Sequence, residues 1–211
     1  MAEMTIIEHA DDAQVAEWLG LRIAAALARS TEVALALPGG STPFPILQLL
    51  IARPLDWQRV TVFPTDDRVV PEDHPASNTG KLRALLEPAG VAVQSLDGIV
   101  GCASTPALPR FSLVWLGMGA DGHIASLFPN TDPRRDDPQP VRRLTPDPLP
   151  PEAPFDRITL TIPALLDSDQ LLLVARGADK RPVLDAAVAG ESDLPIARLL
   201  GAARQPVTCF T

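Results

Sequence analysis

Hydrophobic residues along the chain fall into two kinds of segment, short continuous runs and stretches with helical spacing. The continuous runs predict buried strands, which we place at 32–37, 60–63, 111–116, 157–162, 170–175 and 207–210. The stretches with helical spacing predict helices at 11–30, 44–52, 77–86, 180–189 and 196–200. Strands that are apolar throughout and alternate with helices are typical of a parallel sheet covered on both faces. The pattern therefore predicts an α/β fold with a mostly parallel sheet and helices on both faces.

One stretch, which we call the proline-rich segment, departs from this alternation. It covers residues 129–154 and contains nine prolines and four arginines but few apolar residues. Because proline lacks the backbone N–H that helices and strands use, we expect a loop across the surface rather than a packed element. No internal repeat or boundary divides the chain, so the sequence predicts a single domain over residues 1–211.

Composition and charge limit the kinds of protein and of partner that this sequence can represent. The chain has 211 residues, 46% apolar and 21% charged, as in soluble proteins that bury a core of their own. Acidic residues outnumber basic ones by 26 to 18, which gives a formal net charge of −8. This balance argues against nucleic acid and anionic membranes as partners, since both attract a positive surface.

The sequence also favours a cytoplasmic protein. No apolar run reaches the ~18 residues that a membrane span needs. Residues 1–10 lack the basic-then-apolar pattern of a signal peptide. We expect the protein to act as a monomer or a homodimer.

The spacing of potential metal ligands and nucleophiles excludes several kinds of site. Cys102 and Cys209 lie far apart, without CxxC spacing or a histidine cluster, so neither a disulfide framework nor a zinc site is expected. The motifs HExxH and GxSxG are absent. We therefore expect no metal and no cofactor.

Polar segments follow three of the predicted strands, at 39–42, 65–68 and 117–123. In parallel sheets, ligands bind beyond the carboxyl ends of the strands. We therefore expect the three segments to meet at one edge of the sheet and to form the functional site there.

The first of these segments consists of Gly39, Gly40, Ser41 and Thr42. Two glycines let the backbone approach an anion, and hydroxyl and N–H groups at a helix start bind phosphate. A tight turn with Ser41 or Thr42 as helix cap explains the same residues equally well. Neither GxxxxGK[ST] nor GxGxxG occurs at this segment, which disfavours a nucleotide.

The second segment, Asp66-Asp67-Arg68, lies in a predicted loop at 64–75. An arginine binds phosphate or carboxylate in a forked geometry, and adjacent carboxylates can orient it. The alternative is a solvated charged loop. Because the preceding strand directs the loop to the same edge as the other segments, a functional role is favoured.

The third segment carries His123 behind Gly117, Gly119 and Gly122. A histidine accepts a proton from water near neutral pH, and a carboxylate fixes its tautomer. Asp121 or another acid fills that role. His9 and His74 have no such setting, and we interpret them as structural. The residues thus indicate an enzyme that uses a histidine base on a small, anionic, phosphorylated substrate.

Several segments resemble the signatures of the 6-phosphogluconolactonase family. They are Gly39-Gly-Ser-Thr-Pro43, Asp66-Asp-Arg-Val-Val-Pro71 with Ser77-Asn78, and Leu116-Gly-Met-Gly-Ala-Asp-Gly-His-Ile-Ala-Ser-Leu-Phe-Pro129. The segments 157–161 and 177–180 resemble later parts of the family, so that the match spans 33–188 in the expected order.

The resemblance implies a Rossmann-like fold shared with glucosamine-6-phosphate deaminases and ribose-5-phosphate isomerases. It also implies hydrolysis of 6-phospho-D-glucono-1,5-lactone, a sugar-phosphate lactone, without metal or cofactor, in the oxidative pentose phosphate pathway. The implied catalytic residues are His123, Arg68 and Asp121. The implied substrate-binding residues are Gly39, Gly40, Ser41, Thr42, Asp66, Asp67, Asn78, Gly119 and Lys180.

The chain differs from the family pattern at a few positions. Asp67 stands where the family usually has glutamate, Asn130 where it commonly has glycine, and Pro38 where it has a small polar residue. These differences leave His123 unchanged but alter the geometry expected around Asp67.

Two alternatives stay open. Deaminases share the Asp-Gly-His motif but follow it with a segment that carries a glutamate, at the position of Phe128 here. Because phenylalanine cannot exchange protons, the lactonase is favoured. A non-catalytic module that binds sugar phosphates is the other alternative, and the presence of His123 and Arg68 argues against it.

Overall fold

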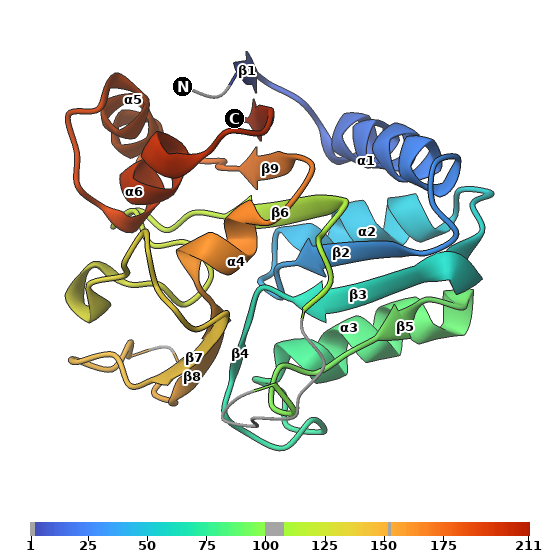
Figure 1. Cartoon of the computed structure of the whole chain (residues 1–211), viewed down its shortest axis with the longest axis horizontal. Helices are drawn as coiled ribbons and strands as arrows, with labels where there is room; N and C mark the ends of the chain where they lie inside the picture. Colours follow the sequence, from blue (N-terminus) through green and yellow to red (C-terminus); the bar gives the residue numbers. More distant parts are fainter. Residues whose placement is uncertain (1–2, 100–107, 152) are drawn as a thin grey trace.

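Parallel strands form the main sheet of the computed structural model, which describes residues 3–99, 108–151 and 153–211 (Figure 1). In these residues the sheet has seven strands in the order β1-β10-β9-β6-β2-β3-β5, and each neighbouring pair is parallel. The bounds are β1 Met4–Ile7, β2 Val33–Leu37, β3 Val60–Pro64, β5 Ala92–Val93, β6 Leu113–Gly117, β9 Leu171–Val174 and β10 Val207–Phe210. The prediction of an α/β fold with a mostly parallel sheet is confirmed.

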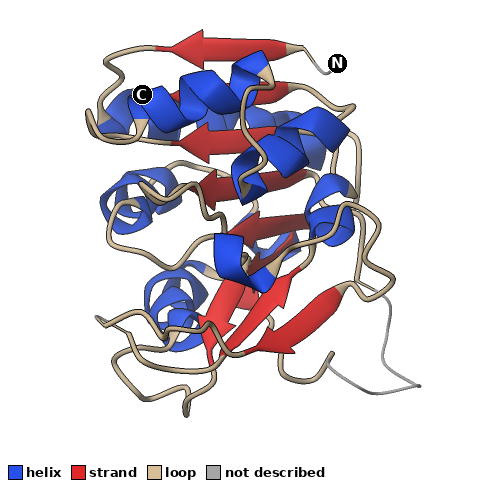
Figure 2. Cartoon of the chain, turned by 90° about the vertical axis from the view of Figure 1, so that its left-hand side faces the viewer, coloured by secondary structure: helices blue, strands red, loops and turns tan. Residues whose placement is uncertain are grey.

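Helices cover both faces of this sheet (Figure 2). They are α1 Asp12–Leu27, α2 Pro43–Ile51, α3 Asn78–Leu86, α4 Ile162–Leu166, α5 Arg181–Ala189 and α6 Pro195–Ala202, with 3-10 turns η1 Trp57–Arg59, η2 Glu87–Ala89 and η3 Pro129–Thr131. Their apolar sides enclose two buried clusters, one beneath α1, α2 and α3 and one beneath α4, α5 and α6. Because side chains alternate along a strand, β6 sends Trp115 into the first cluster and Leu116 into the second.

Local signals set the ends of several helices. The Asp11 carboxylate accepts a hydrogen bond from the Gln14 backbone N–H at 2.8 Å, and the Gln14 side chain accepts one from the Asp11 N–H at 2.9 Å. This reciprocal pair begins α1. Pro43 occupies the first turn of α2, as predicted. Gly190 ends α5 in the left-handed conformation, at φ 74°.

A second sheet, which is antiparallel, is joined to the first through Thr65 at the end of β3. It consists of β4 Asp66–Arg68, β8 Arg157–Leu160 and β7 Val141–Leu144, in the order β4-β8-β7. Two predictions are wrong here. Residues 66–68 form a strand rather than a loop, and the strand predicted at 157–162 lies outside the parallel sheet. All four residues of β8 are buried, although its sequence, Arg-Ile-Thr-Leu, alternates polar and apolar residues as antiparallel strands commonly do.

The prediction that the proline-rich segment contains no packed element is also wrong. The segment includes η3 and β7, and Val141 at the start of β7 is only 4% exposed. No proline lies within β7, so its hydrogen-bonded ladder with β8 is intact despite the prolines on either side.

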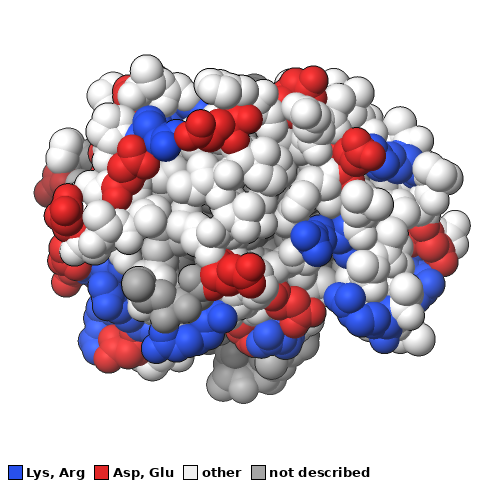
Figure 3. All heavy atoms as spheres, turned by 90° about the horizontal axis from the view of Figure 1, so that it is seen from above, with Lys and Arg blue, Asp and Glu red and all other residues white. Residues whose placement is uncertain are grey.

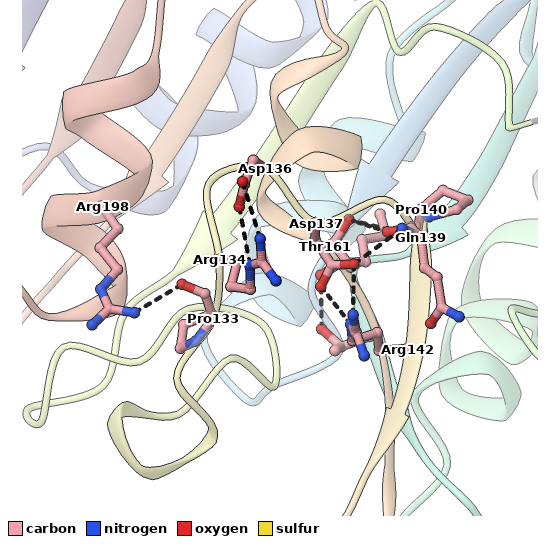
Figure 4. A network of polar contacts seen from close by, with 11 residues as sticks. Pro133, Arg134, Asp136, Asp137, Gln139, Pro140, Arg142, Thr161 and Arg198 are labelled. Carbon is pink, nitrogen blue, oxygen red and sulfur yellow. Dashed lines mark hydrogen bonds and ion pairs between the residues drawn. The ribbon is translucent and has the colours of Figure 1, made fainter.

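Side-chain contacts hold the rest of the proline-rich segment in place (Figure 4). Arg142 of β7 forms an ion pair with the Asp137 carboxylate, whose side chain is 6% exposed. Arg198 of α6 donates a hydrogen bond to the Pro133 carbonyl at 3.0 Å. Arginine side chains thereby supply donors to a stretch of backbone that is poor in N–H groups.

Besides β4 and β7, the strands β1 and β5 and the helix α4 were not predicted. The two middle residues of the edge strand β1 are exposed, so no continuous apolar run marks it. Strand β5 has two residues and α4 has five, too few for a periodic pattern.

The parallel direction of the strands determines where the chain can form a site. Strand β6 lies between β2 and β9, and β3 lies beside β2. The segments that follow these four strands therefore leave the sheet side by side, at one edge. They include the three polar segments singled out above and residues 175–180.

The surface shows no separation of charge by sign on the face in Figure 3, where acidic and basic side chains are interspersed. Within the described ranges, no helix is both long and apolar enough to cross a membrane. Cys102 lies outside the described residues. The single-domain organisation and the oligomeric state stay predictions.

Candidate active site

A cavity of about 440 Å³ opens at the carboxyl ends of β2, β3, β6 and β9. The predicted site residues that line it are Gly39, Gly40, Ser41, Thr42, Asp66, Arg68, Asn78, Gly119, His123 and Lys180. Asp67 and Asp121 do not line it, but each contacts a residue that does. Lining residues that were not among the predicted site residues are Pro38, Pro43, Trp115, Gly117, Met118, Ala125 and Val174.

His123 is paired with Asp121. The Asp121 Oδ1 atom lies 2.6 Å from His123 Nδ1, and the same oxygen accepts a hydrogen bond from the His123 backbone N–H at 3.2 Å. Because a carboxylate accepts hydrogen bonds, this contact places the ring proton on Nδ1 and leaves Nε2 free to accept a proton. The sequence left open whether Asp121 or another acid pairs with His123. In the structure, Asp121 itself contacts the imidazole ring.

Gly119 makes room for this pair. A Cβ atom on Gly119 would lie 2.2 Å from His123 Nδ1 and 2.5 Å from Asp121 Oδ1, closer than atoms approach without displacement. Gly117, Gly119 and Gly122 also have the spacing GxGxxG, but no helix follows them as it does in dinucleotide sites. The glycines therefore fit a turn built around the histidine.

Phe128 packs on the His123 ring, with centroids 4.8 Å apart and an angle of 36° between the planes. The imidazole is thus held by Asp121 at one nitrogen and by an aromatic ring beside it. In the sequence, Phe128 stands out only as the residue that replaces a glutamate, and its contact with the His123 ring was not predicted.

Neutral groups, rather than the neighbouring acids, hold the Arg68 side chain. Its Nη1 donates to Asn78 Oδ1 at 2.6 Å and to the Ala76 carbonyl at 3.1 Å. Its Nε is buried without a hydrogen-bond partner among the described residues. No ion pair joins Arg68 to Asp66 or Asp67 in the described part of the chain, and these acids act on the guanidinium only indirectly, through Asn78. The guanidinium charge at the cavity is therefore not neutralised by a carboxylate contact.

Arg157 adds a second positive charge beside Arg68. It stands opposite Arg68 in the β4–β8 register and donates to the carbonyls of Ala153 and Phe155, at 2.7 and 2.5 Å. Burial lowers the pKa of Arg157 from its usual value, and the neighbouring Arg68 charge lowers it further. In the sequence, Arg157 stands out only as part of the segment 157–161 that carries the family resemblance.

Asp66 presents a fixed carboxylate to the cavity. Its Oδ2 accepts a hydrogen bond from Ser126 Oγ at 2.5 Å, and its Oδ1 accepts one from Thr65 Oγ1 at 3.2 Å. The Asn78 amide donates to the Asp66 carbonyl at 2.8 Å. Ser126 and Thr65 are buried and were not predicted as site residues, although Ser126 lies in the same segment as His123.

Asp67 turns away from the cavity and onto the start of α3. Its carboxylate accepts hydrogen bonds from the backbone N–H groups of Asn78 at 2.5 Å and Thr79 at 2.8 Å. It accepts two more, from Ser77 Oγ at 3.2 Å and the Arg68 N–H at 2.7 Å. These contacts explain an aspartate at a position where the family usually has the longer glutamate. They indicate a supporting role, and its role as a substrate-binding residue stays a prediction.

The other end of the cavity carries the glycine-serine-threonine turn and Lys180. Thr42 precedes α2 without a side-chain capping bond, which weakens the alternative that it serves as a cap. Gly39 packs so closely on Asn78 that a Cβ atom would lie 2.2 Å from Asn78 Cγ. The Lys180 side chain lines the cavity, and no described residue forms an ion pair or hydrogen bond with its ammonium group. This end of the cavity therefore has both space for an anion and the positive charge of Lys180, which no described residue compensates.

Other candidate groups lie away from this chemistry. Among the described residues, no three His, Cys, Asp or Glu side chains come together to hold a metal ion. Burial raises the pKa of Cys209 to about 12, so its thiol is not a nucleophile near neutral pH. His74 Nδ1 accepts a hydrogen bond from the Ala76 N–H at 3.1 Å, which agrees with its structural interpretation.

Comparison with known proteins identifies the family. The profile of the family described as "Glucosamine-6-phosphate isomerases/6-phosphogluconolactonase" matches residues 10–97 and 88–208. The chain belongs to this family. The resemblance to 6-phosphogluconolactonases noted in the sequence is thereby confirmed.

Relatives in the family include two proteins named 6-phosphogluconolactonase. The one from Mesorhizobium japonicum is 36% identical over 90% of this chain and 85% of its own length. The one from Pseudomonas aeruginosa is 36% identical over 89% of this chain and 84% of its own length. A crystal structure of a 6-phosphogluconolactonase from Shewanella baltica superposes with a TM-score of 0.82 at 28% identity, covering 100% of this chain and 97% of that one.

The family description includes two activities. At the position where the sequence resemblance implies a glutamate in deaminases, this chain has Phe128. The apolar ring instead lies against His123. The site thus offers one base and its aspartate partner, but no second acid at that position.

We expect Asp67→Ala to destabilise the fold, because it removes the acceptor for four hydrogen bonds at the β4–α3 junction. The free energy of unfolding should fall by about 2–4 kcal/mol, since buried donors lose their partner. Urea denaturation measures this change, with Asp73→Ala, an exposed position nearby, as the matched control. Unchanged stability together with a raised KM would instead make Asp67 a substrate contact.

Proposed function

We propose that the protein hydrolyses 6-phospho-D-glucono-1,5-lactone to 6-phosphogluconate, in the cytoplasm, as a step of the oxidative pentose phosphate pathway. The observation that carries this proposal is the His123–Asp121 pair in a cavity that also holds the unpaired cations Arg68 and Lys180. A base for water and positive charge for a phosphate are what hydrolysis of a phosphorylated lactone requires. The names of the relatives support the same activity.

His123 acts as the general base. With its Nδ1 proton held by Asp121, Nε2 takes a proton from water as the water oxygen bonds to the lactone carbonyl carbon. The resulting imidazolium is stabilised by the Asp121 carboxylate. When the bond from this carbon to the ring oxygen breaks, the imidazolium returns its proton to the ring oxygen, which becomes a hydroxyl. The product carries a carboxylic acid, which ionises in solution.

Positive groups stabilise the charges in this reaction. The tetrahedral intermediate carries a negative oxygen, and Arg68 or the N–H groups of the Gly117–Gly122 turn stabilise it. Lys180 and the turn from Gly40 to Thr42 bind the phosphate. The lysine stands at the N-terminal end of α5, where a cation is unfavourable against the helix dipole, so a bound dianion offsets that cost.

We expect the protein to open freshly generated 6-phosphogluconolactone faster than the spontaneous reaction, and to do so after exhaustive EDTA treatment. It should release no ammonia from glucosamine-6-phosphate, because Phe128 supplies no acid. A coupled assay for the lactone product and an ammonia assay measure both reactions. Binding without turnover would favour a non-catalytic module, and rapid ammonia release would favour a deaminase.

His123→Ala should lower kcat by about 10²- to 10⁴-fold with little change in KM, since the loss of a general base slows only the chemical step. Steady-state kinetics on lactone opening give both constants. His9→Ala is the control, because His9 does not line the cavity. Full activity of a folded His123→Ala variant would contradict the assignment.

Lys180→Ala should raise KM for the phosphorylated lactone by about 10- to 100-fold, because a hydrogen bond to a charged group is worth about 1.5–3 kcal/mol. Hydrolysis of unphosphorylated gluconolactone should be nearly unchanged. Lys81→Ala, at the other lysine of the chain, is the matched control. Equal effects on the two lactones would place Lys180 outside the phosphate site.

A further inference from the structure

The chain reverses direction directly after the histidine of the cavity. In the turn at 124–127 the Leu127 N–H donates a hydrogen bond to the Ile124 carbonyl at 2.9 Å, and both of these residues are buried. The turn brings Phe128 back onto the His123 ring, with the ring centroids 4.8 Å apart. The contact between the two rings therefore depends on the conformation of this turn.

The first central residue of the turn has an unfavourable backbone conformation. Ala125 has a φ of 50°, in the left-handed region that favours glycine. Turns with a positive φ at this position normally carry glycine, asparagine or aspartate. An alanine keeps such a conformation only where the surrounding structure holds it. The turn at 124–127 therefore needs contacts from outside to keep its shape.

Ser126, the second central residue, supplies those contacts. It is 1% exposed, and its hydroxyl donates a hydrogen bond to Asp66 Oδ2 at 2.5 Å. Its backbone N–H donates to Thr159 Oγ1 at 3.2 Å. Asp66 and Thr159 stand directly opposite each other in the β4–β8 register, so Ser126 binds both members of one cross-strand pair. The bond to Asp66 is the stronger of the two, because its acceptor is a carboxylate.

Ser126 joins two parts of the site without lining it. Ala125, His123 and Asp66 are among the described residues that line the cavity, whereas Ser126 is not. Asp66 belongs to β4, which also carries Arg68. The serine thus links the loop of the histidine to the strand that brings a positive charge to the cavity. Any effect of Ser126 on a reaction there passes through these neighbours.

We propose that Ser126 is a positioning residue for the histidine base. By joining the turn to Asp66 it holds Ala125 at positive φ, and the turn in this conformation keeps Phe128 against the His123 ring. The effect on catalysis rests on the function proposed above, because it requires that His123 take a proton from water. The position of the ring does not depend on which reaction the site performs.

Ser126→Ala removes the hydroxyl and leaves the backbone N–H in place. We expect kcat for lactone opening to fall by about 10- to 100-fold, the loss that a displaced catalytic group causes, with little change in KM. The control is Ser168→Ala, since Ser168 is also 1% exposed and donates to the Leu165 carbonyl at 3.0 Å, away from the cavity. It should lower Tm and leave kcat unchanged. Equal kcat values for the two variants would overturn the proposal.

A second substitution separates positioning from a loss of stability. Glycine adopts a positive φ without the steric cost that alanine has, so the turn should recover its shape in the double variant Ala125→Gly, Ser126→Ala. We expect kcat of the double variant to exceed that of Ser126→Ala by about 5-fold, which corresponds to the cost of the left-handed conformation for a residue other than glycine. A double variant with no higher kcat would place the effect of Ser126 elsewhere and refute the proposal.

The position of the ring can be measured without turnover. The chain has three histidines, His9, His74 and His123, whose ring-proton resonances are assigned by replacing each with alanine. Ser126→Ala should move the His123 resonances, because the ring loses the shift that Phe128 causes. The His74 resonances should stay in place, although this ring also contacts an aromatic ring, that of Phe155.

Ser126→Cys nearly keeps the volume of serine and donates only weakly, so it should move the His123 resonances in the same direction by less. This variant also tests the proposal if Ser126→Ala does not fold. His123 resonances that stay in place in both variants would contradict the proposal. A shift of these resonances in a protein that does not open the lactone would contradict only the proposed function.

Discussion

The carboxylate of Asp67 is the interaction on which the geometry of the site depends. It joins the backbone of β4 to the first turn of α3 through four hydrogen bonds. On one side of it stands Asp66, whose carboxylate faces the cavity, and on the other stands Arg68. The same junction positions Asn78, which binds both the Arg68 guanidinium and the Asp66 carbonyl. A single buried acid thus places two charged residues and one amide around the cavity.

Charge compensation differs between the cavity and the proline-rich segment. In the proline-rich segment, Arg134 and Arg142 each form an ion pair with an aspartate, and these ion pairs hold the backbone in place. Arg68 at the cavity and the buried Arg157 beside it are held by neutral acceptors. Neutral acceptors fix the position of a guanidinium without cancelling its field, which suits a site for an anionic substrate.

The histidine and the turn at 39–42 lie on different sides of the sheet. The His123 loop packs into the core beneath α4, α5 and α6, whereas the turn stands before α2, over the opposite face of the sheet. Lys180, at the start of α5, belongs to the side of the histidine. The parallel strands bring these groups to one edge of the sheet, where all of them line the same cavity.

The linear pattern alone determined the alternation of strands and helices, the three polar segments that meet at one edge, and the family. These features depend on local composition and on the direction of parallel strands, so they can be predicted from the sequence. Tertiary structure alone decided that residues 66–68 and 141–144 pair with β8 in a second sheet, since antiparallel partners far apart in sequence leave no local signal. It also decided that Asp66 faces the cavity whereas Asp67 turns onto the start of α3, because two adjacent acids look alike until their neighbours are known.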